Sequence, residues 1–227
     1  MKASENDPLR PIYHFLPEAN WMNDPNGPVY HNREYHLFYQ YNPFENKWGQ
    51  IHWGHTKSND LVYWERLPIA LSTKKGKETH CFSGDCIIHE GIPKIIYTSI
   101  GLEKSPSINA EQWIAIGDKE MFLWKKPDYN PILTHKIHKK LEIHDWRDPF
   151  LWKEKDKYYM VLGGHIVKPR KPVVLLYQSL KSLKNWVFLN PLYIGNRKDK
   201  NQGRNWEYPN FFKIQNNFRL AHLIILK

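Results

Sequence analysis

Four acidic residues recur at similar intervals along the chain and could act together as acids, bases or nucleophiles. Asp24, Asp85, Asp148 and Glu207 are 61, 63 and 59 residues apart, and each lies within two residues of a proline or glycine. Repetition on this scale indicates that they hold equivalent positions in successive repeats, so that they converge on one site. Asp24 taken alone, in Asn-Asp-Pro-Asn-Gly, would equally suit a tight turn.

Clustered carboxylates among many aromatic side chains are typical of proteins that act on sugars. The chain has 10 Trp, 13 Tyr and 10 Phe residues, whose rings can stack on the apolar faces of sugars. A retaining glycosidase needs a nucleophile and an acid/base about 5–5.5 Å apart. Like charges at such range raise the pKa of one group. A third carboxylate can hold substrate hydroxyls and stabilise the transition state.

The elements that position these acids are predicted to be strands. Residues 35–40, 95–98 and 158–162 are short runs rich in β-branched and aromatic residues, and polar or glycine-containing turns flank them. No long segment keeps an apolar period of 3.6 residues. The sequence therefore predicts an all-β fold.

A second marker repeats with the same period as the acids. Trp64, Trp124 and Trp186 follow one another at intervals of 60 and 62 residues, each in a similar apolar setting that favours a role in packing. An all-strand unit of this size corresponds to one four-stranded blade of a β-propeller. Innermost strands of a propeller line a central channel, so we expect the four acids to surround a funnel at one end of it.

The length of the chain limits the number of blades. Its 227 residues hold three repeats and about half of a fourth, whereas a ring of five at this period needs roughly 300 residues. We expect a single partial propeller domain over residues 1–227. The alternatives are a ring of few blades and a fragment of a longer protein.

Three motifs together resemble glycoside hydrolase family 32, which contains invertases, sucrose-6-phosphate hydrolases and fructan hydrolases. They are Trp-Met-Asn-Asp-Pro-Asn-Gly at 21–27, Trp-Arg-Asp-Pro at 146–149 and Trp-Glu-Tyr-Pro at 206–209, and the resemblance extends from about residue 12 to about residue 213. It implies a five-bladed propeller followed by a C-terminal β-sandwich, and the latter is absent from this chain. The family usually has Glu-Cys-Pro in the third motif, where this chain has Tyr208.

The resemblance also implies roles for individual residues. Asp24 corresponds to the nucleophile, Glu207 to the general acid/base and Asp148 to the stabiliser of the transition state. Arg147 is expected to fix Asp148 by a charge-assisted hydrogen bond, and Trp48 to stack on the sugar. The positions implied to line the fructose subsite are Asn23, Gln40, Trp48, Phe82, Ser83 and Arg147.

The implied activity is hydrolysis of terminal β-D-fructofuranosides, such as sucrose, sucrose 6-phosphate or fructans, with retention of configuration. A fructosyltransferase with the same active site is one alternative. An inactive relic, or a propeller that binds carbohydrate without cleaving it, is another. The expected partner is a small-molecule or oligosaccharide substrate, and no metal or other cofactor is expected.

Composition bears on the remaining classes of function. The net charge is +10, but the lysines are scattered and the only dense basic run is residues 168–172, so a nucleic-acid binder is not favoured. No run of 18 apolar residues occurs, and the first eight residues contain no apolar leader, so we expect a cytoplasmic protein without membrane contact. Two cysteines, Cys81 and Cys86, exclude a disulfide framework and are expected to be buried.

Overall fold

The computed structural model describes residues 7–11, 15–102, 108, 110–196 and 198–225. Strands dominate this part of the chain, together with two short 3-10 turns, η1 (His135–His138) and η2 (Lys200–Gln202). No helix within it has the length and apolarity that crossing a lipid bilayer requires. The expectation that the chain starts without an apolar leader rests mostly on residues 1–6, which lie outside the described residues.

The strands form three sheets of four and one sheet of two. Within each sheet, strands that follow one another in sequence pair antiparallel. The first sheet contains β1 (Trp21–His31), β2 (Glu34–Asn42), β3 (His52–Ser58) and β4 (Glu65–Leu71). The second contains β5 (His80–His89), β6 (Ile92–Ile100), β7 (Ala110–Gly117) and β8 (Trp124–Lys125). The third contains β9 (Ile143–Glu154), β10 (Lys157–Ile166), β11 (Lys171–Leu180) and β12 (Trp186–Ile194). The last pairs β13 (Asn205–Ile214) with β14 (Asn217–Ile225).

Each sheet starts with the same tight hairpin. A two-residue turn joins its first two strands, and the first turn residue has a positive φ, as two-residue hairpins require. The paired residues that flank the four turns are His31–Glu34, His89–Ile92, Glu154–Lys157 and Ile214–Asn217. The repeat of about sixty residues predicted from the sequence is therefore a repeat of one supersecondary unit.

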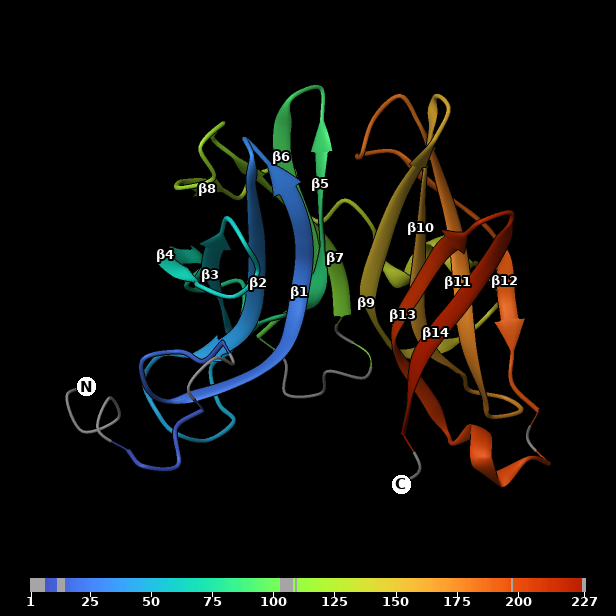
Figure 1. Ribbon diagram of the computed structural model, residues 1–227. Coiled ribbons are helices and arrows are strands. Elements are labelled where there is room, and N and C mark those ends of the chain that lie inside the picture. The colour runs from blue at the N-terminus through green and yellow to red at the C-terminus, as the bar shows by residue number, and fades with distance from the viewer. Residues whose placement is uncertain (1–6, 12–14, 103–107, 109, 197, 226–227) are drawn as a thin grey trace.

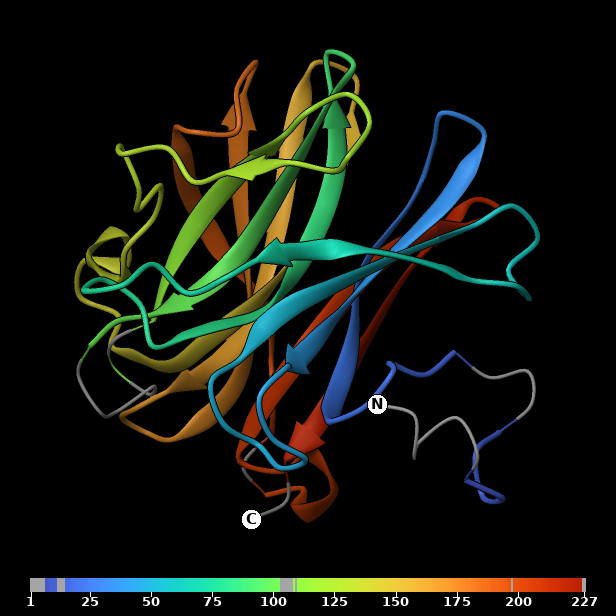
Figure 2. The ribbon, with the colours of Figure 1, turned by 90° about the vertical axis from the view of Figure 1, so that its left-hand side faces the viewer.

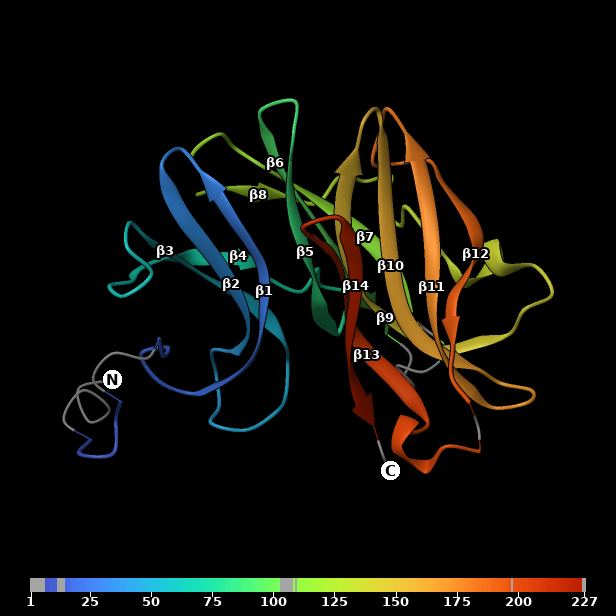
Figure 3. The same cartoon turned by 45° about the vertical axis from the view of Figure 1, so that its right-hand side comes forward.

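The sheets are arranged as blades around an axis. Their first strands, β1, β5, β9 and β13, lie side by side in that order in the middle of the molecule (Figures 1 and 3). The strands within a sheet twist strongly, so that the outer strands of the first sheet turn far away from β1 (Figure 2). The all-β propeller architecture with about three and a half blades is confirmed.

The hydrophobic cores lie between neighbouring blades. One cluster joins Trp53 of the first sheet to Tyr97 of the second. Another joins Ile114 of the second sheet to Trp146 of the third, and a third surrounds Trp206 of the last sheet with valines of the third. Each sheet therefore covers an apolar face of the next.

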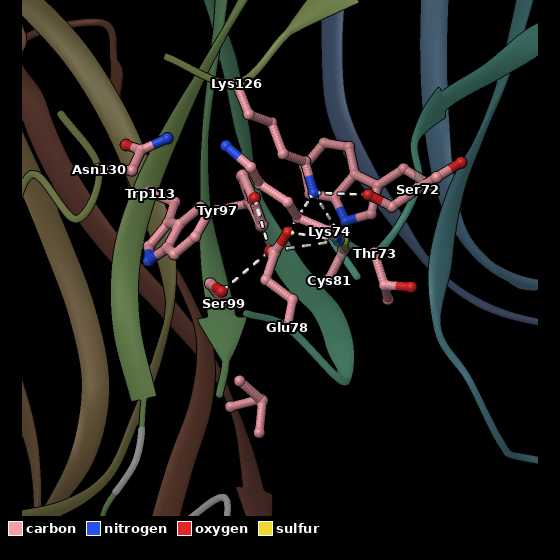
Figure 4. A network of polar contacts seen from close by, with 12 residues as sticks. Ser72, Thr73, Lys74, Glu78, Cys81, Tyr97, Ser99, Trp113, Lys126 and Asn130 are labelled. Carbon is pink, nitrogen blue, oxygen red and sulfur yellow. Dashed lines mark hydrogen bonds and ion pairs between the residues drawn. The ribbon is translucent and has the colours of Figure 1, made fainter. Parts of the chain in front are cut away.

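A buried polar network braces the connection between β4 and β5 (Figure 4). The side chain of Glu78 is fully buried and pairs with Lys126 at 2.6 Å, while the hydroxyls of Tyr97 and Ser99 donate to its other oxygen at 2.7 and 2.9 Å. The Lys126 ammonium also lies 3.3 Å from Cys81 Sγ. Burial raises the pKa of this thiol to about 12, so it stays protonated. Both cysteines are free and buried, as expected.

Candidate active site

Backbone irregularities mark the region around Asp24, Asp148 and Glu207, which is called the funnel below. Asp24, Asp148 and Tyr208 have positive φ angles of 21°, 62° and 52°, precede a proline and lie where the pairing of their strand shifts register. A β-bulge inserts one extra residue, so consecutive side chains can reach the same side of the strand. The sequence analysis treated Glu207 as the equivalent of Asp148. By its φ angle and its place at the register shift, Tyr208 is the equivalent of Asp148, so Glu207 corresponds to Arg147.

The carboxylate of Asp24 sits at the end of a chain of side-chain hydrogen bonds. The hydroxyl of Ser83 donates to its Oδ2 at 2.7 Å, and the amide of Asn23 donates to its Oδ1 at 2.9 Å. Gln40 in turn donates to Ser83 Oγ at 2.7 Å. Three of the predicted subsite residues, from β1, β2 and β5, thus orient Asp24.

Asp148 is buried and held by backbone groups. Its Oδ2 accepts the N–H of Tyr208 at 3.0 Å, and its own N–H donates to Thr98 Oγ1 at 3.0 Å. Burial raises the pKa of Asp148 to about 6, and the negative charge of Asp24 adds to this, against the opposing effects of Arg147 and the Tyr208 N–H. Asp148 therefore has a raised pKa, and burial contributes more to it than the like charge of Asp24 does.

Arg147 connects the third blade to the last. Its guanidinium contacts the carboxylate of Glu207 and donates to Asp145, whose carboxylate and carbonyl oxygens lie 3.2 and 3.1 Å away. The distance from Arg147 Nε to Asp148 Oδ2 is 3.9 Å, too long for a hydrogen bond. The expectation that Arg147 fixes Asp148 through a hydrogen bond is wrong, because its donors are directed at Glu207 and Asp145.

Aromatic rings form a row that runs from Trp48 to Phe82, the residue before Ser83. Trp48 is 54 % exposed, and its ring centroid lies 4.9 Å from that of His80. His80 in turn lies 5.5 Å from Phe82, whose carbonyl accepts the indole N–H of Trp53 at 3.0 Å. The structure thus connects Trp48 and Phe82, two of the predicted subsite residues, through an intervening histidine.

Asp85 is buried to about the same extent as Asp148. In β5 the register shift falls between Cys81 and Gly84, so Asp85 comes after the bulge. Its two oxygens accept the N–H groups of Cys86 at 2.8 Å and Leu151 at 2.9 Å, which ties β5 to β9. Burial raises its pKa to about 7 despite these two hydrogen bonds. Asp85 lines a cavity of about 210 Å³ in the channel, together with Asp148 and Tyr208.

Sequence reasoning missed several residues that shape the site. His80 stands two residues before Phe82, a predicted subsite residue, but carried no marker of its own. Thr98 comes from β6, on which no motif lies, and nothing in the sequence linked it to Asp148. Asp145 stands only two residues before Arg147, and a second acid so near to an arginine was a usable signal.

Carboxylates from different blades, a buried acid with a raised pKa and a row of aromatic rings, all on a β-propeller, define the propeller domain of a glycoside hydrolase. The family model described as the glycosyl hydrolases family 32 N-terminal domain matches residues 14–227. The chain therefore belongs to glycosyl hydrolase family 32.

Characterised relatives agree with this assignment. The chain is 37% identical over 216 residues to a sucrose-6-phosphate hydrolase of Zymomonas mobilis, a match that covers 91% of this chain and 41% of the relative. It is 38% identical over 221 residues to a levanase of Bacillus subtilis, which covers 92% of this chain and 30% of the relative. The chain thus spans less than half the length of either relative.

Solved structures give the same result. A β-fructofuranosidase of Bombyx mori, solved as a mutant in complex with sucrose, superposes with a TM-score of 0.86 at 35% identity, covering 97% of this chain and 45% of that one. A fructan 1-exohydrolase of Cichorium intybus superposes with a TM-score of 0.78 at 33% identity, covering 91% of this chain and 38% of that one.

Proposed function

We propose that this chain is the catalytic propeller of an enzyme that hydrolyses terminal β-D-fructofuranosides with retention of configuration. The observation that carries the proposal is the gathering of Asp24, Asp148 and Glu207 from three blades around Arg147 and Tyr208. Further support comes from the relatives, which are named as hydrolases of sucrose 6-phosphate and of levan and as β-fructofuranosidases. Sucrose, sucrose 6-phosphate and fructans form the proposed substrate class.

In this proposal Asp24 is the nucleophile. Ser83 and Asn23 donate hydrogen bonds to both of its oxygens, which orients the carboxylate. One oxygen attacks the anomeric carbon of the fructosyl unit. The bond from that carbon to the glycosidic oxygen breaks, and a fructosyl ester of Asp24 forms.

Glu207 serves as the acid and then as the base. It gives its proton to the departing glycosidic oxygen in the first step. In the second step it takes a proton from the water that attacks the ester, which releases fructose and restores Asp24. The guanidinium of Arg147, in contact with Glu207, orients this carboxyl group.

Asp148 and the row of aromatic rings hold the sugar. An ionised Asp148 accepts hydrogen bonds from fructose hydroxyls, and these strengthen as positive charge develops on the ring. Its position is fixed by the Tyr208 N–H and is independent of a bond to Arg147. Trp48, more than half exposed, offers its ring to an apolar face of the substrate.

The test is release of glucose and fructose from sucrose by the full-length protein and its Asp24→Asn variant. Equimolar release by the unchanged protein, lost in the variant, is the expected result. Excess glucose would instead indicate fructosyl transfer, and absence of release would favour a binding protein or relic. Substantial residual turnover in Asp24→Asn would refute the nucleophile assignment. The single-domain boundary, the cytoplasmic location and the exclusion of nucleic-acid and membrane partners stay predictions from the sequence.

A further inference from the structure

Tyr208 has an unusual backbone conformation for its size. It lies in β13 with a φ of 52°, in the left-handed region that large side chains rarely adopt. Such conformations persist where surrounding contacts impose them, and they concentrate at functional sites. The contacts of Tyr208 therefore indicate what the conformation serves.

These contacts extend from the last blade to the third and the first. The backbone N–H donates to Asp148 Oδ2 at 3.0 Å. The phenol hydroxyl donates to Asn26 Oδ1 at 3.4 Å, and Asn26 is a fully buried residue of β1. One residue thus joins β13 to both β9 and β1, the strands that carry Asp148 and Asp24.

Tyr208 forms part of the wall of the cavity in the channel. It lines that cavity with Gly27, Asp85 and Asp148. Burial raises the pKa of Tyr208 far above its usual range, and the charges of Asp24, Asp148 and Asp85 raise it further. The phenol is therefore a neutral group with an apolar body, and it lines the same cavity as the carboxyl group of Asp148.

We infer that Tyr208 is a positioning residue that fills the cavity wall next to Asp148 and holds this carboxyl group in place for the substrate. The inference rests on the proposed function of the site. Removing the ring enlarges the cavity that Asp148 lines and admits water to it, which relieves the burial of Asp148 and loosens its position. Removing only the hydroxyl keeps the ring in the cavity wall but breaks the connection to Asn26.

Other charged groups around Asp148 are kept constant in this comparison. The charge of Asp24 acts on it from β1, and Asp85 of β5 lines the same cavity. Arg147, which contacts Glu207 of β13, precedes it on its own strand. None of them changes when Tyr208 is replaced. A change in the titration of Asp148 therefore reports the loss of the ring.

The decisive variants are Tyr208→Ala and Tyr208→Phe in the full-length protein, with Tyr158→Phe as a matched control. Tyr158 is a buried tyrosine on β10 of the third blade, and its hydroxyl lies 2.7 Å from Nδ1 of His89 on β5 of the second blade. The first measurement is the carbon NMR titration of the Asp148 carboxyl group, which needs no turnover. We expect its midpoint to fall by about one pH unit in Tyr208→Ala, and to stay unchanged in Tyr208→Phe and in the control.

The second measurement is kcat and KM for sucrose. We expect kcat/KM to fall about tenfold in Tyr208→Ala, mainly through kcat, and about threefold in Tyr208→Phe, with the control unchanged. An unshifted Asp148 midpoint together with unchanged kinetics in Tyr208→Ala would overturn the inference. If that variant does not fold, unchanged kinetics in Tyr208→Phe would do so. A shifted midpoint in an unmodified protein that releases no fructose would contradict the proposed function but uphold the role of Tyr208.

Discussion

The hydroxyl of Ser83 in the second blade donates a hydrogen bond of 2.7 Å to the carboxylate of Asp24 in the first. Ser83 is fully buried and is itself fixed by Gln40. The orientation of Asp24 therefore depends on how the first two blades are packed together as well as on its own strand.

Replacing Ser83 by Ala is expected to lower kcat/KM for sucrose on the order of 10- to 100-fold, the value of one hydrogen bond to a charged group. The matched control is Ser99→Ala, another buried serine, which contacts Glu78 and lies outside the funnel. The control should lose stability while keeping kcat/KM. Equal kinetics for the two variants would show that the contact of Ser83 with Asp24 has no catalytic value.

The raised pKa of Asp85 predicts that the stability of the protein depends on pH. Burial raises its pKa to about 7, from 3.8 for an ordinary aspartate, so the folded protein binds this proton more tightly than the unfolded chain does. The stability of the unchanged protein relative to Asp85→Asn should therefore fall as pH rises from about 4 to about 7, and then level off. Melting temperatures of both proteins at about pH 5 and about pH 8 measure it. A difference independent of pH would show that Asp85 ionises normally.

Gly163 permits the close approach of the third and last blades. A Cβ atom at this position would lie 2.2 Å from the carbonyl oxygen of Trp206, next to Glu207. Gly163→Ala is expected to destabilise the protein by about 1–3 kcal/mol and to lower kcat by displacing Glu207. Gly101→Ala is the control, because its nearest atom would be 4.0 Å away. Urea unfolding and kcat measurements test both, and similar behaviour of the two variants would contradict the prediction.

Lys126 and Glu78 form a pair whose members are 11% and 0% exposed. Replacing Lys126 by Met leaves the Glu78 carboxylate without its cation, which is expected to cost about 3–5 kcal/mol. The double variant with Glu78→Gln should recover much of this loss, since it removes the unpaired charge. Urea unfolding of the two single variants and the double variant forms a cycle. Additive effects in that cycle would mean that the two side chains do not stabilise each other.

The blade repeat and the catalytic candidates were predictable because they depend on local patterns. Strand-forming runs and two-residue turns recur with a visible period, and the motifs around Asp24 and Asp148 are contiguous. The structure brings Asn23, Gln40 and Ser83 together around Asp24, and it brings Arg147 into contact with Glu207.

Register was not predictable to the residue. A bulge shifts every later side chain by one position, and it arises from contacts between strands that are distant in sequence. This is why Asp85 was placed in the same ring as the other acids. The alignment of Glu207 with Asp148 rested on spacing alone and was avoidable, because the motifs Trp-Arg-Asp-Pro and Trp-Glu-Tyr-Pro pair Glu207 with Arg147. The contact of Arg147 with Glu207 joins two sheets, and no local pattern predicted it.

Because the apolar clusters lie at the junctions between sheets, this propeller resembles a row of coupled units with nearest-neighbour interactions. Loosening the cluster around Trp53 would then speed amide hydrogen exchange in the first two sheets before the third. The half-blade of β13 and β14 has one such junction, around Trp206, and Glu207 directly follows that tryptophan. The place of Glu207, the proposed acid/base, thus depends on how firmly this junction between the third and last sheets holds together.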